Sequence, residues 1–129
     1  MPNFILIADD DLDNREIAKE ILEAHGFSVL IATNGIEAVE LARSKKPAVI
    51  LMDLSMPKLD GWQATKMLKE DPATKNIVII AYTAHASRAD EAKAIAGQCD
   101  DYVSKPCPPK ILLTKITDWL EQIRQRKAC

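Results

Sequence analysis

Several apolar runs of this chain stop at a polar residue. The polar residues are Asp9 with Asp10, Asp53, Thr83 and Lys105. Short unbroken apolar runs are typical of strands that are buried on both faces of a parallel sheet. The carboxyl ends of parallel strands meet at one edge of the sheet, and ligands collect outside that edge. We therefore expect these five side chains to lie close together.

The residue types at this edge favour phosphoryl chemistry with a magnesium ion. Two carboxylates about 4 Å apart repel by roughly 1 kcal/mol in water and ~4 kcal/mol at an effective dielectric of 20, so a cluster of them takes up protons or binds a hard cation. Oxygen ligands without His or Cys favour Mg²⁺ over Zn²⁺. With its charge neutralised, Asp53 can attack phosphorus as a nucleophile. Lys105 can then pair with a phosphoryl oxygen, and the Thr83 hydroxyl can donate to another.

Strand and helix patterns alternate along the whole chain. Strands are expected over residues 4–8, 27–32, 48–52, 77–82 and 101–103, each followed by a helix. The second strand alternates more than the others and is expected nearer an edge of the sheet. Connections this short, with right-handed crossovers, predict an α/β fold: a doubly wound five-stranded parallel sheet with helices on both faces.

Capping pairs and apolar stripes define the expected helices. The pairs that open the first three are Asp13 with Glu16, Asn34 with Glu37, and Asp60 with Gln63. The expected buried stripes are Ile17, Ile21, Leu22 and Ala24 in the first helix, Ile36, Val39 and Ala42 in the second, and Ala64 and Leu68 in the third. The fourth helix, expected from Ser87 to Gly97, buries mostly alanine. At ~0.8 kcal/mol per buried CH₂, it is weakly anchored compared with its neighbours.

Size and composition are those of one ordinary globular domain. The chain has 129 residues, 47% of them hydrophobic and 28% charged. A net charge of −2 offers no electrostatic footprint for nucleic acid or a membrane surface. No apolar run approaches the ~20 residues that cross a bilayer, and no signal peptide is recognised at the start. Cys99, Cys107 and Cys129 share no metal-ligand spacing, so we expect reduced thiols and a cytoplasmic location.

Four segments together resemble the response-regulator receiver domain of two-component signalling, in its stand-alone, single-domain form. They are Ile5-Leu6-Ile7-Ala8-Asp9-Asp10, Leu51-Met52-Asp53 with Met56-Pro57-Lys58-Leu59-Asp60-Gly61, Tyr82-Thr83-Ala84, and Tyr102-Val103-Ser104-Lys105-Pro106. Each segment alone is a weak signal, but all four in order are highly specific. The resemblance covers essentially the full length, and it implies a flavodoxin-like strand order 2-1-3-4-5. It also implies one receiver domain over residues 1–129, with no output domain.

The resemblance assigns a role to each acidic residue. It implies that Asp53 accepts phosphate from a histidine kinase or a histidine phosphotransfer protein, as in a phosphorelay. It implies that Mg²⁺ is bound by Asp10, Asp53 and the main-chain carbonyl of Ser55, with Asp9 acting mainly through water. On this basis the protein is a signalling switch that promotes its own phosphorylation and dephosphorylation, and not a metabolic enzyme.

The resemblance further implies a switch made by Thr83 and Tyr102. On phosphorylation Thr83 moves toward the phosphoryl group and Tyr102 turns inward, which reshapes the face formed by the fourth helix, fifth strand and fifth helix. That face then binds a downstream protein, which the sequence does not name, and the chain is expected as a monomer or a weak phosphorylation-linked dimer. A cis peptide at Lys105-Pro106 is also an expectation from the family.

Several residues near the site have two readings. Asp11 is a solvated residue before the first helix, or it acts on the metal indirectly, through the groups that bind the ion. His85 is an exposed residue at the rim, or a pH-sensitive modulator of the phosphate lifetime. Cys107 replaces a larger apolar residue common in the family, either as a packing substitution or as a redox sensor. Ser55 borders the same pocket, so the sequence does not define the phosphate lifetime.

Three other functions are weighed against the phosphorylation switch. A receiver that binds proteins independently of phosphorylation is the non-enzymatic alternative, although such proteins typically lose a site residue. The enzymatic alternative is an aspartyl-phosphate hydrolase of the dehalogenase type. The sequence pattern of that family has a second Asp two residues after the nucleophile. Ser55 occupies that position here. A nucleotide-binding module would instead need a glycine-rich first turn, where this chain has acidic residues.

Overall fold

The computed structural model describes residues 4–54, 56, 58–83, 99–104 and 108–128. The elements in chain order are β1 Phe4–Ala8, α1 Leu12–Ala24, β2 Ser28–Ala32, α2 Gly35–Lys45, β3 Val49–Met52, α3 Gly61–Glu70, β4 Val78–Thr83, β5 Asp101–Ser104 and α5 Pro109–Ala128. The fourth helix expected over 87–97 lies outside the described residues, as do Ser55, His85, Lys105, Pro106 and Cys107.

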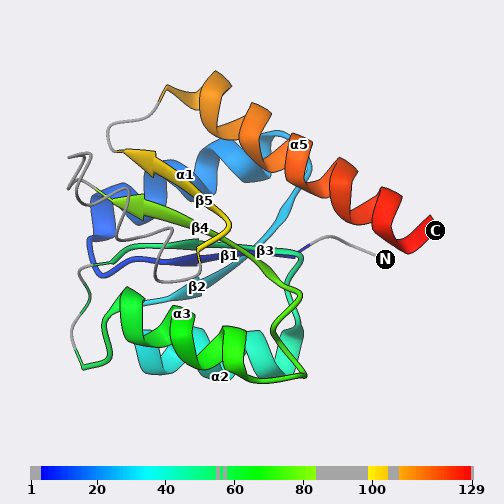
Figure 1. Ribbon diagram of the computed structural model, residues 1–129. Coiled ribbons are helices and arrows are strands. Elements are labelled where there is room, and N and C mark those ends of the chain that lie inside the picture. The colour runs from blue at the N-terminus through cyan, green and yellow to red at the C-terminus, as the bar shows by residue number, and fades with distance from the viewer. Residues whose placement is uncertain (1–3, 55, 57, 84–98, 105–107, 129) are drawn as a thin grey trace.

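The strands form one parallel five-stranded sheet in the order β2-β1-β3-β4-β5 (Figure 1). This confirms the expected doubly wound, flavodoxin-like order, with β2 at an edge. The last residue of β1, Ala8, is in register with Ala32 of β2 and with Met52 of β3. The ends of these strands are therefore level, which brings the residues that follow β1 and β3 side by side.

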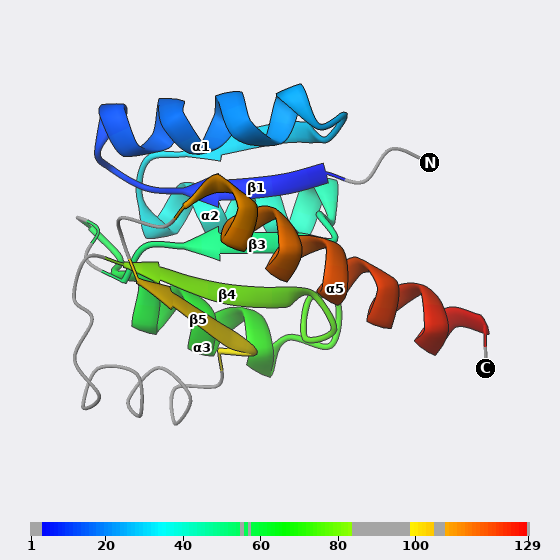
Figure 2. The same ribbon diagram turned by 90° about the horizontal axis from the view of Figure 1, so that it is seen from above.

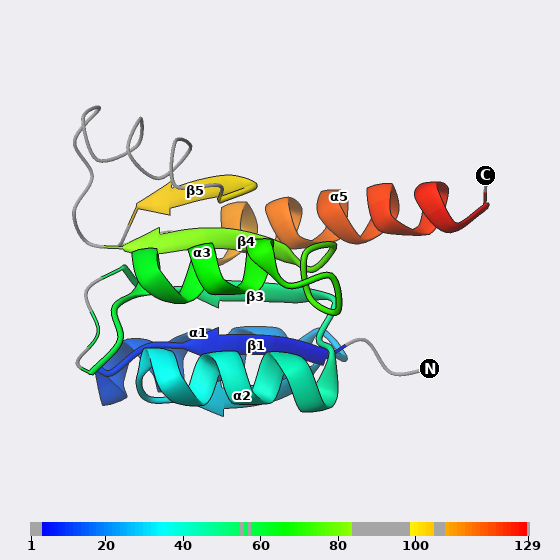
Figure 3. The same cartoon turned by 60° about the horizontal axis from the view of Figure 1, so that its bottom comes forward.

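Helices cover both faces of the sheet (Figures 2 and 3). On one face, α1 and α5 bury Ala18, Leu22, Leu112 and Ile116 against β1, β3 and β4 residues such as Ile7, Leu51 and Ile80. On the other face, α2 and α3 bury Ala38, Val39, Ala42, Ala64 and Leu68 against Leu6, Ile50 and Ile79. The central strand β3 is buried at all four of its residues, as its unbroken apolar run predicts.

The expected buried stripes are only partly right. Val39, Ala42, Ala64, Leu68 and Leu22 are buried as expected. Ile17 is 55% exposed and Ile36 is 46% exposed, and Ala24 is exposed as well. In α1 the small side chain of Ala18 faces the sheet instead of its larger neighbour. Adjacent helical residues point about 100° apart, so burying Ala18 turns Ile17 outward.

Two of the three expected helix caps are confirmed. The Asn34 side chain accepts from the Glu37 amide at the start of α2, and Asp60 and Gln63 form a reciprocal capping box at α3. The pair expected at Asp13 is wrong, because Asp11 caps α1 and accepts from the Asn14 amide. Its own amide donates to an Asp9 carboxylate oxygen at 2.9 Å, which holds Asp11 in the extended conformation that a cap needs.

A lysine of α3 binds the residues that precede β4 and β5, at the end of the sheet where these parallel strands begin. The Lys69 ammonium donates to the carbonyl oxygen of Ile77 at 2.8 Å and to the Asp100 carboxylate at 2.7 Å. The same Asp100 oxygen accepts from the Ile79 amide at 2.8 Å. The Lys69 side chain is only 12% exposed. This cluster fixes α3 to the starts of β4 and β5, at the edge opposite the expected site.

Cys99 carries a free thiol that is buried. Its Sγ lies 3.9 Å from Thr65 Oγ1. Burial raises the pKa of the Cys99 thiol, and the nearby Asp100 carboxylate raises it further, against the Thr65 hydrogen bond. A raised pKa disfavours the reactive thiolate.

Within the described part of the chain, no helix has the length and apolar character that crossing a membrane requires.

Candidate functional site

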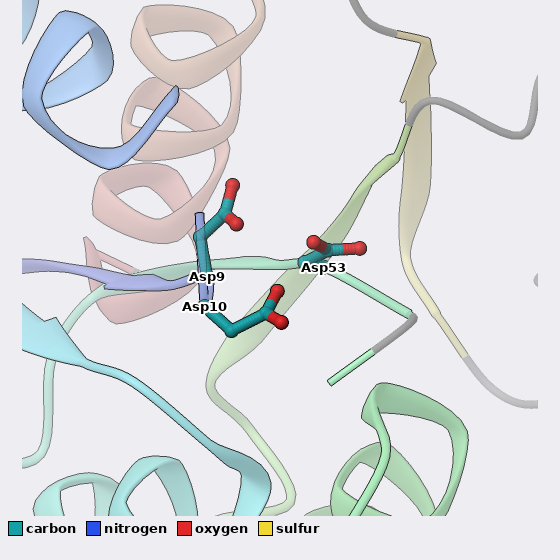
Figure 4. Close-up of side chains that lie close together, drawn as sticks. All are labelled: Asp9, Asp10 and Asp53. Carbon is teal, nitrogen blue, oxygen red and sulfur yellow. The ribbon is translucent and has the colours of Figure 1, made fainter. Parts of the chain in front are cut away.

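Asp9, Asp10 and Asp53 lie together at the carboxyl edge of the sheet (Figure 4). One carboxylate oxygen from each residue lies within 4.8 Å of the oxygens of the other two. Asp9 is 1% exposed and Asp53 is 8% exposed, whereas Asp10 is exposed. The three residues therefore form an acidic cluster with a buried floor and an open side at Asp10. The expected convergence of these carboxylates is confirmed.

Backbone hydrogen bonds place the two buried carboxylates. The Asp9 amide donates to the Ala32 carbonyl at 3.0 Å, and the Asp53 amide donates to the Ala8 carbonyl at 2.9 Å. Both residues thus continue the strand pairing by one step beyond β1 and β3. The Arg15 guanidinium, from the first turns of α1, donates to the Asp9 carbonyl at 3.1 Å. Asp9 is held through its amide, its carbonyl and its carboxylate, so its position is determined by its surroundings.

Two glycines let other parts of the chain approach the segment that follows Asp53. A Cβ on Gly61, the first residue of α3, would lie 2.2 Å from the carbonyl oxygen of Asp53. A Cβ on Gly35, the first residue of α2, would lie 1.9 Å from the carbonyl oxygen of Leu59. Between them, Lys58 takes a left-handed backbone conformation, with φ of 66°. Asp53 and Leu59 therefore lie so close to the starts of α3 and α2 that neither Gly61 nor Gly35 has room for a side chain.

Two cations, Lys58 and Arg15, act on the Glu37 carboxylate of α2. The Glu37 carboxylate accepts from the amide and the hydroxyl of Thr33, both at 2.7 Å. These hydrogen bonds lower the pKa of Glu37, and the charges of Lys58 and Arg15 lower it further, while burial opposes them. Glu37 therefore stays ionised and lies within electrostatic reach of both cations. Arg15 links this charge group to the main chain of Asp9.

The donor set of the acidic cluster fits a small hard cation. All three ligands are carboxylate oxygens, one of them exposed, which leaves room for water or an anionic ligand beside the ion. Mg²⁺ prefers such oxygen ligands and keeps several waters, whereas Zn²⁺ prefers His and Cys. Repulsion between carboxylates at this spacing lies between roughly 1 kcal/mol per pair in water, which applies to the exposed Asp10, and about 4 kcal/mol at an effective dielectric of 20, and a divalent ion relieves it.

The remaining predicted site residues are placed in part. Thr83 is the last residue of β4 and is in register with Ser104 of β5, at the same edge as the acidic cluster. Tyr102 is half-buried in β5 and packs against the core between the sheet and the α2–α3 layer. The Ser55 carbonyl and the Lys105 ammonium lie outside the described residues. Their roles and the switch motion stay predictions.

Arg15, Gly35 and Gly61 are contributors to the site that sequence reasoning did not assign a role. Arg15 acts on a main-chain oxygen, and nothing in the sequence pattern marks such a contact. The helix-start glycines do not have positive φ, so no turn signal distinguishes them. Their function is close approach of two backbones. Each glycine directly follows a capping residue, and Gly61 also lies in a segment that resembles the receiver family.

Comparisons with known proteins agree with this geometry. The family model described as "Response regulator receiver domain" matches residues 5–117. The chain is 36% identical over 120 residues to the polar-differentiation response regulator DivK of Brucella anthropi, an alignment that covers 93% of this chain and 98% of the relative. DivK of Brucella ovis is 34% identical over the same share of each chain.

Solved structures show the same fold. The receiver domain of a signal transduction histidine kinase from Syntrophus aciditrophicus matches with a TM-score of 0.87 and 30% identity, covering 94% of this chain and 92% of that one. The receiver domain of sensor histidine kinase PA1611 from Pseudomonas aeruginosa matches with a TM-score of 0.87 and 29% identity, covering 94% and 99%. That structure has a magnesium ion coordinated in its active site cleft.

The matched residues extend from the start of β1 into α5 and include every acidic residue of the cluster. A receiver domain of two-component signalling implies a histidine kinase as partner. The chain belongs to the response regulator receiver domain family, and it is a signalling switch and not a metabolic enzyme.

Proposed function

We propose that this protein is a stand-alone phosphorylation switch, one receiver domain over residues 1–129, in which Asp53 accepts a phosphoryl group. The observation that carries the proposal is the acidic cluster of Asp9, Asp10 and Asp53, with oxygens within 4.8 Å of one another at the ends of β1 and β3. Asp53 is nearly buried, at 8% exposure. The neighbouring Asp10 is exposed, so a phosphodonor would approach the cluster from that side.

The acidic cluster would hold Mg²⁺ through Asp10, Asp53 and the main-chain carbonyl of Ser55, with Asp9 acting through water. When bound, the ion supplies charge neutralisation for the phosphoryl oxygens and for the carboxylates. The phosphoryl group leaves its donor nitrogen and forms a bond to a carboxylate oxygen of Asp53. Asp9, fixed through its main chain, keeps the floor of the cluster in one geometry during this transfer.

Thr83 and Lys105 are proposed to complete the phosphoryl site. The Thr83 hydroxyl donates to one phosphoryl oxygen and the Lys105 ammonium pairs with another. Thr83 stands at the end of β4, at the same edge as the cluster, which supports its part. Tyr102 packs on the α2–α3 side of β5 and responds to the displacement of Thr83. The face containing β5 and α5 then changes its affinity for a downstream protein.

The phosphodonor is proposed to be a histidine kinase or a histidine phosphotransfer protein, and the switch works in the cytoplasm as a monomer or a weak phosphorylation-linked dimer. The identity with DivK proteins over nearly the full length of both chains supports a role in signalling by protein–protein contact. No basic patch for nucleic acid is indicated by the net charge of −2.

Intact-mass spectrometry tests the acceptor assignment. Wild type, Asp53→Asn and Asp118→Asn are incubated with a small acyl phosphate and Mg²⁺. Asp118 is an exposed residue of α5, so its variant is a matched control for the loss of one carboxylate. We expect a single phosphoryl adduct on wild type and on Asp118→Asn and none on Asp53→Asn. The adduct on wild type should fall when EDTA replaces Mg²⁺.

Equal adduct on wild type and Asp53→Asn would refute Asp53 as the acceptor. Adduct on none of the three proteins would favour the phosphorylation-independent binding module instead. A lysate pull-down with wild type held by beryllofluoride, compared with Asp53→Asn under the same conditions, then separates phosphorylation-dependent partners from those that bind regardless.

A further inference from the structure

Asp101, the first residue of β5, joins that strand to α5. One of its carboxylate oxygens accepts from the Trp119 indole nitrogen at 2.9 Å. The Lys115 ammonium reaches both oxygens, at 3.1 and 3.2 Å. Lys115 and Trp119 are four residues apart and so lie on one side of α5. A single carboxylate therefore receives two side-chain donors from the same face of one helix.

The same carboxylate also holds the main chain of the next residue. The amide of Tyr102 donates to Asp101 Oδ1 at 2.7 Å. Successive residues of a strand point to opposite faces of the sheet. Accordingly Val103 packs in the core on the α5 side, and Tyr102 packs against the core on the α2–α3 side. Asp101 thus contacts α5 on one face and the peptide of Tyr102, whose ring occupies the other face.

The contacts of Asp101 are those of an ionised carboxylate. Burial acts to raise its pKa, but the hydrogen bonds from Trp119, from the Tyr102 amide and from Lys115 outweigh burial and lower the pKa of Asp101. Its side chain is 25% exposed and that of Lys115 is 36% exposed, so water reaches the pair only in part. Hydrogen bonds to an ionised group are roughly twice as strong as those between neutral groups.

We propose that Asp101 is a positioning residue that couples α5 to the switch tyrosine. Its carboxylate ties Lys115 and Trp119 to the peptide of Tyr102, so a displacement of Tyr102 pulls on α5. This inference rests on the proposed function, in which Tyr102 responds to phosphorylation of Asp53. It adds the route by which that response reaches α5, and it makes Trp119 a built-in reporter of the switch.

Trp119 fluorescence tests this coupling directly. The chain has two tryptophans, so a Trp62→Phe background leaves Trp119 alone. Beryllofluoride with Mg²⁺ serves as the phosphoryl mimic. We expect the mimic to change Trp119 emission in the background protein and not after Asp53→Asn. Asp101→Asn and Lys115→Met should remove most of this change in emission.

Two controls separate coupling from loss of structure. Lys115→Arg keeps a cation within reach of Asp101 and should retain the emission change, whereas Asp118→Asn removes an exposed carboxylate from the same helix and should leave it unaltered. Acyl-phosphate adducts on Asp53 are measured by intact mass in every variant. Should Asp101→Asn fail to fold, Lys115→Met decides the question, because the Lys115 side chain is partly exposed.

Each result bears on the inference. Emission changes of equal size in the background protein and in Lys115→Met, with Asp53 phosphorylated in both, would overturn the coupling and leave the proposed function standing. Unaltered Trp119 emission in a background protein that carries the adduct would overturn it too. If the background protein takes up no phosphoryl group, the proposed function itself fails, and the coupling fails with it.

Discussion

Replacing Gly61 with alanine would insert a methyl group into the backbone contact beside Asp53. The new carbon would lie 2.2 Å from the Asp53 carbonyl oxygen and 2.7 Å from the Cα of Leu54. Ordinary van der Waals contact begins at 3.4 Å, so the loop and the start of α3 must separate by about 1.2 Å. Neither obstacle is a flexible side chain, so the main chain has to move.

Two effects compete in this substitution, and their magnitudes decide whether it raises or lowers the free energy of unfolding. Alanine in place of glycine stabilises a helix by up to about 1 kcal/mol, and less at a first helical position such as this one. Overpacking a close contact costs about 1–3 kcal/mol, and a clash with backbone lies at the upper end. We expect a net loss of about 2 kcal/mol in the free energy of unfolding, which lowers the urea midpoint by roughly 1 M.

Urea unfolding with and without Mg²⁺ is the assay. Gly26→Ala is the matched control, because a Cβ there meets nothing within 4 Å although φ is +87°. The control loses about 1–2 kcal/mol from backbone strain alone. It should keep the full stabilisation by Mg²⁺, which is about 2.7 kcal/mol when the ion is present at 100 times its dissociation constant. Gly61→Ala should lose part of that gain, because the displaced Asp53 is a proposed ligand.

A neutral or stabilising Gly61→Ala would refute the reasoning, since helix propensity would then outweigh the contact. So would a destabilised Gly61→Ala that keeps the same Mg²⁺-dependent gain as Gly26→Ala. In that case the close approach would matter for stability and not for the geometry of the acidic cluster.

Three further predictions follow from the acidic cluster, a helix cap and the Asp101 contacts. In EDTA, Asp10→Asn should be more stable to urea than wild type by up to about 1 kcal/mol, because the substitution removes like-charge repulsion. The variant should also lose most of the stabilisation by added Mg²⁺. A lower stability than wild type in EDTA would contradict this prediction. Asp60→Ala removes the carboxylate that accepts from the Gln63 amide, which is one half of the capping box. It should lower the free energy of unfolding by about 1 kcal/mol in the same titration, whereas an unchanged midpoint would show that this cap contributes little. The folded-state pKa of Asp101 is held below its ordinary 3.8, so the contribution of ionised Asp101 to the free energy of unfolding is complete above that pH and is lost as the pH falls through the folded value. When stability is measured against pH, the curve below about pH 4 should therefore be shallower for Asp101→Asn than for wild type. Parallel curves would count against this prediction.

The topology and the acidic cluster were predictable because both depend on patterns that persist along the chain. Unbroken apolar runs such as β3 identify buried parallel strands, and residues just after such strands must share an edge. This rule alone predicts that Asp9, Asp10 and Asp53 lie together. The capping residues Asn34 and Asp60 were also predictable, because each lies in a short local motif whose hydrogen bonds involve residues only three apart.

The failures concern orientation and contact across the chain. The first helix buries Ala18 and leaves Ile17 exposed. A shift of one residue rotates the buried face by about 100°, so the apolar pattern alone did not determine which of the two faces the sheet. Asp11 and not Asp13 caps that helix, because the Asp9 carboxylate fixes the Asp11 amide, a contact that depends on how the loop after β1 folds. The glycine contacts join residues on different elements, so no local pattern reveals them.

The Lys69 cluster has a practical consequence for engineering this fold. It holds the starts of β4 and β5 to α3 at the amino edge, whereas the carboxylates lie beyond the opposite ends of the strands. The Lys69 anchor and the proposed phosphoryl site thus lie at opposite ends of the same strands. Substitutions that strengthen the anchoring around Lys69 should raise the melting temperature without altering the carboxylates at which phosphoryl transfer is proposed.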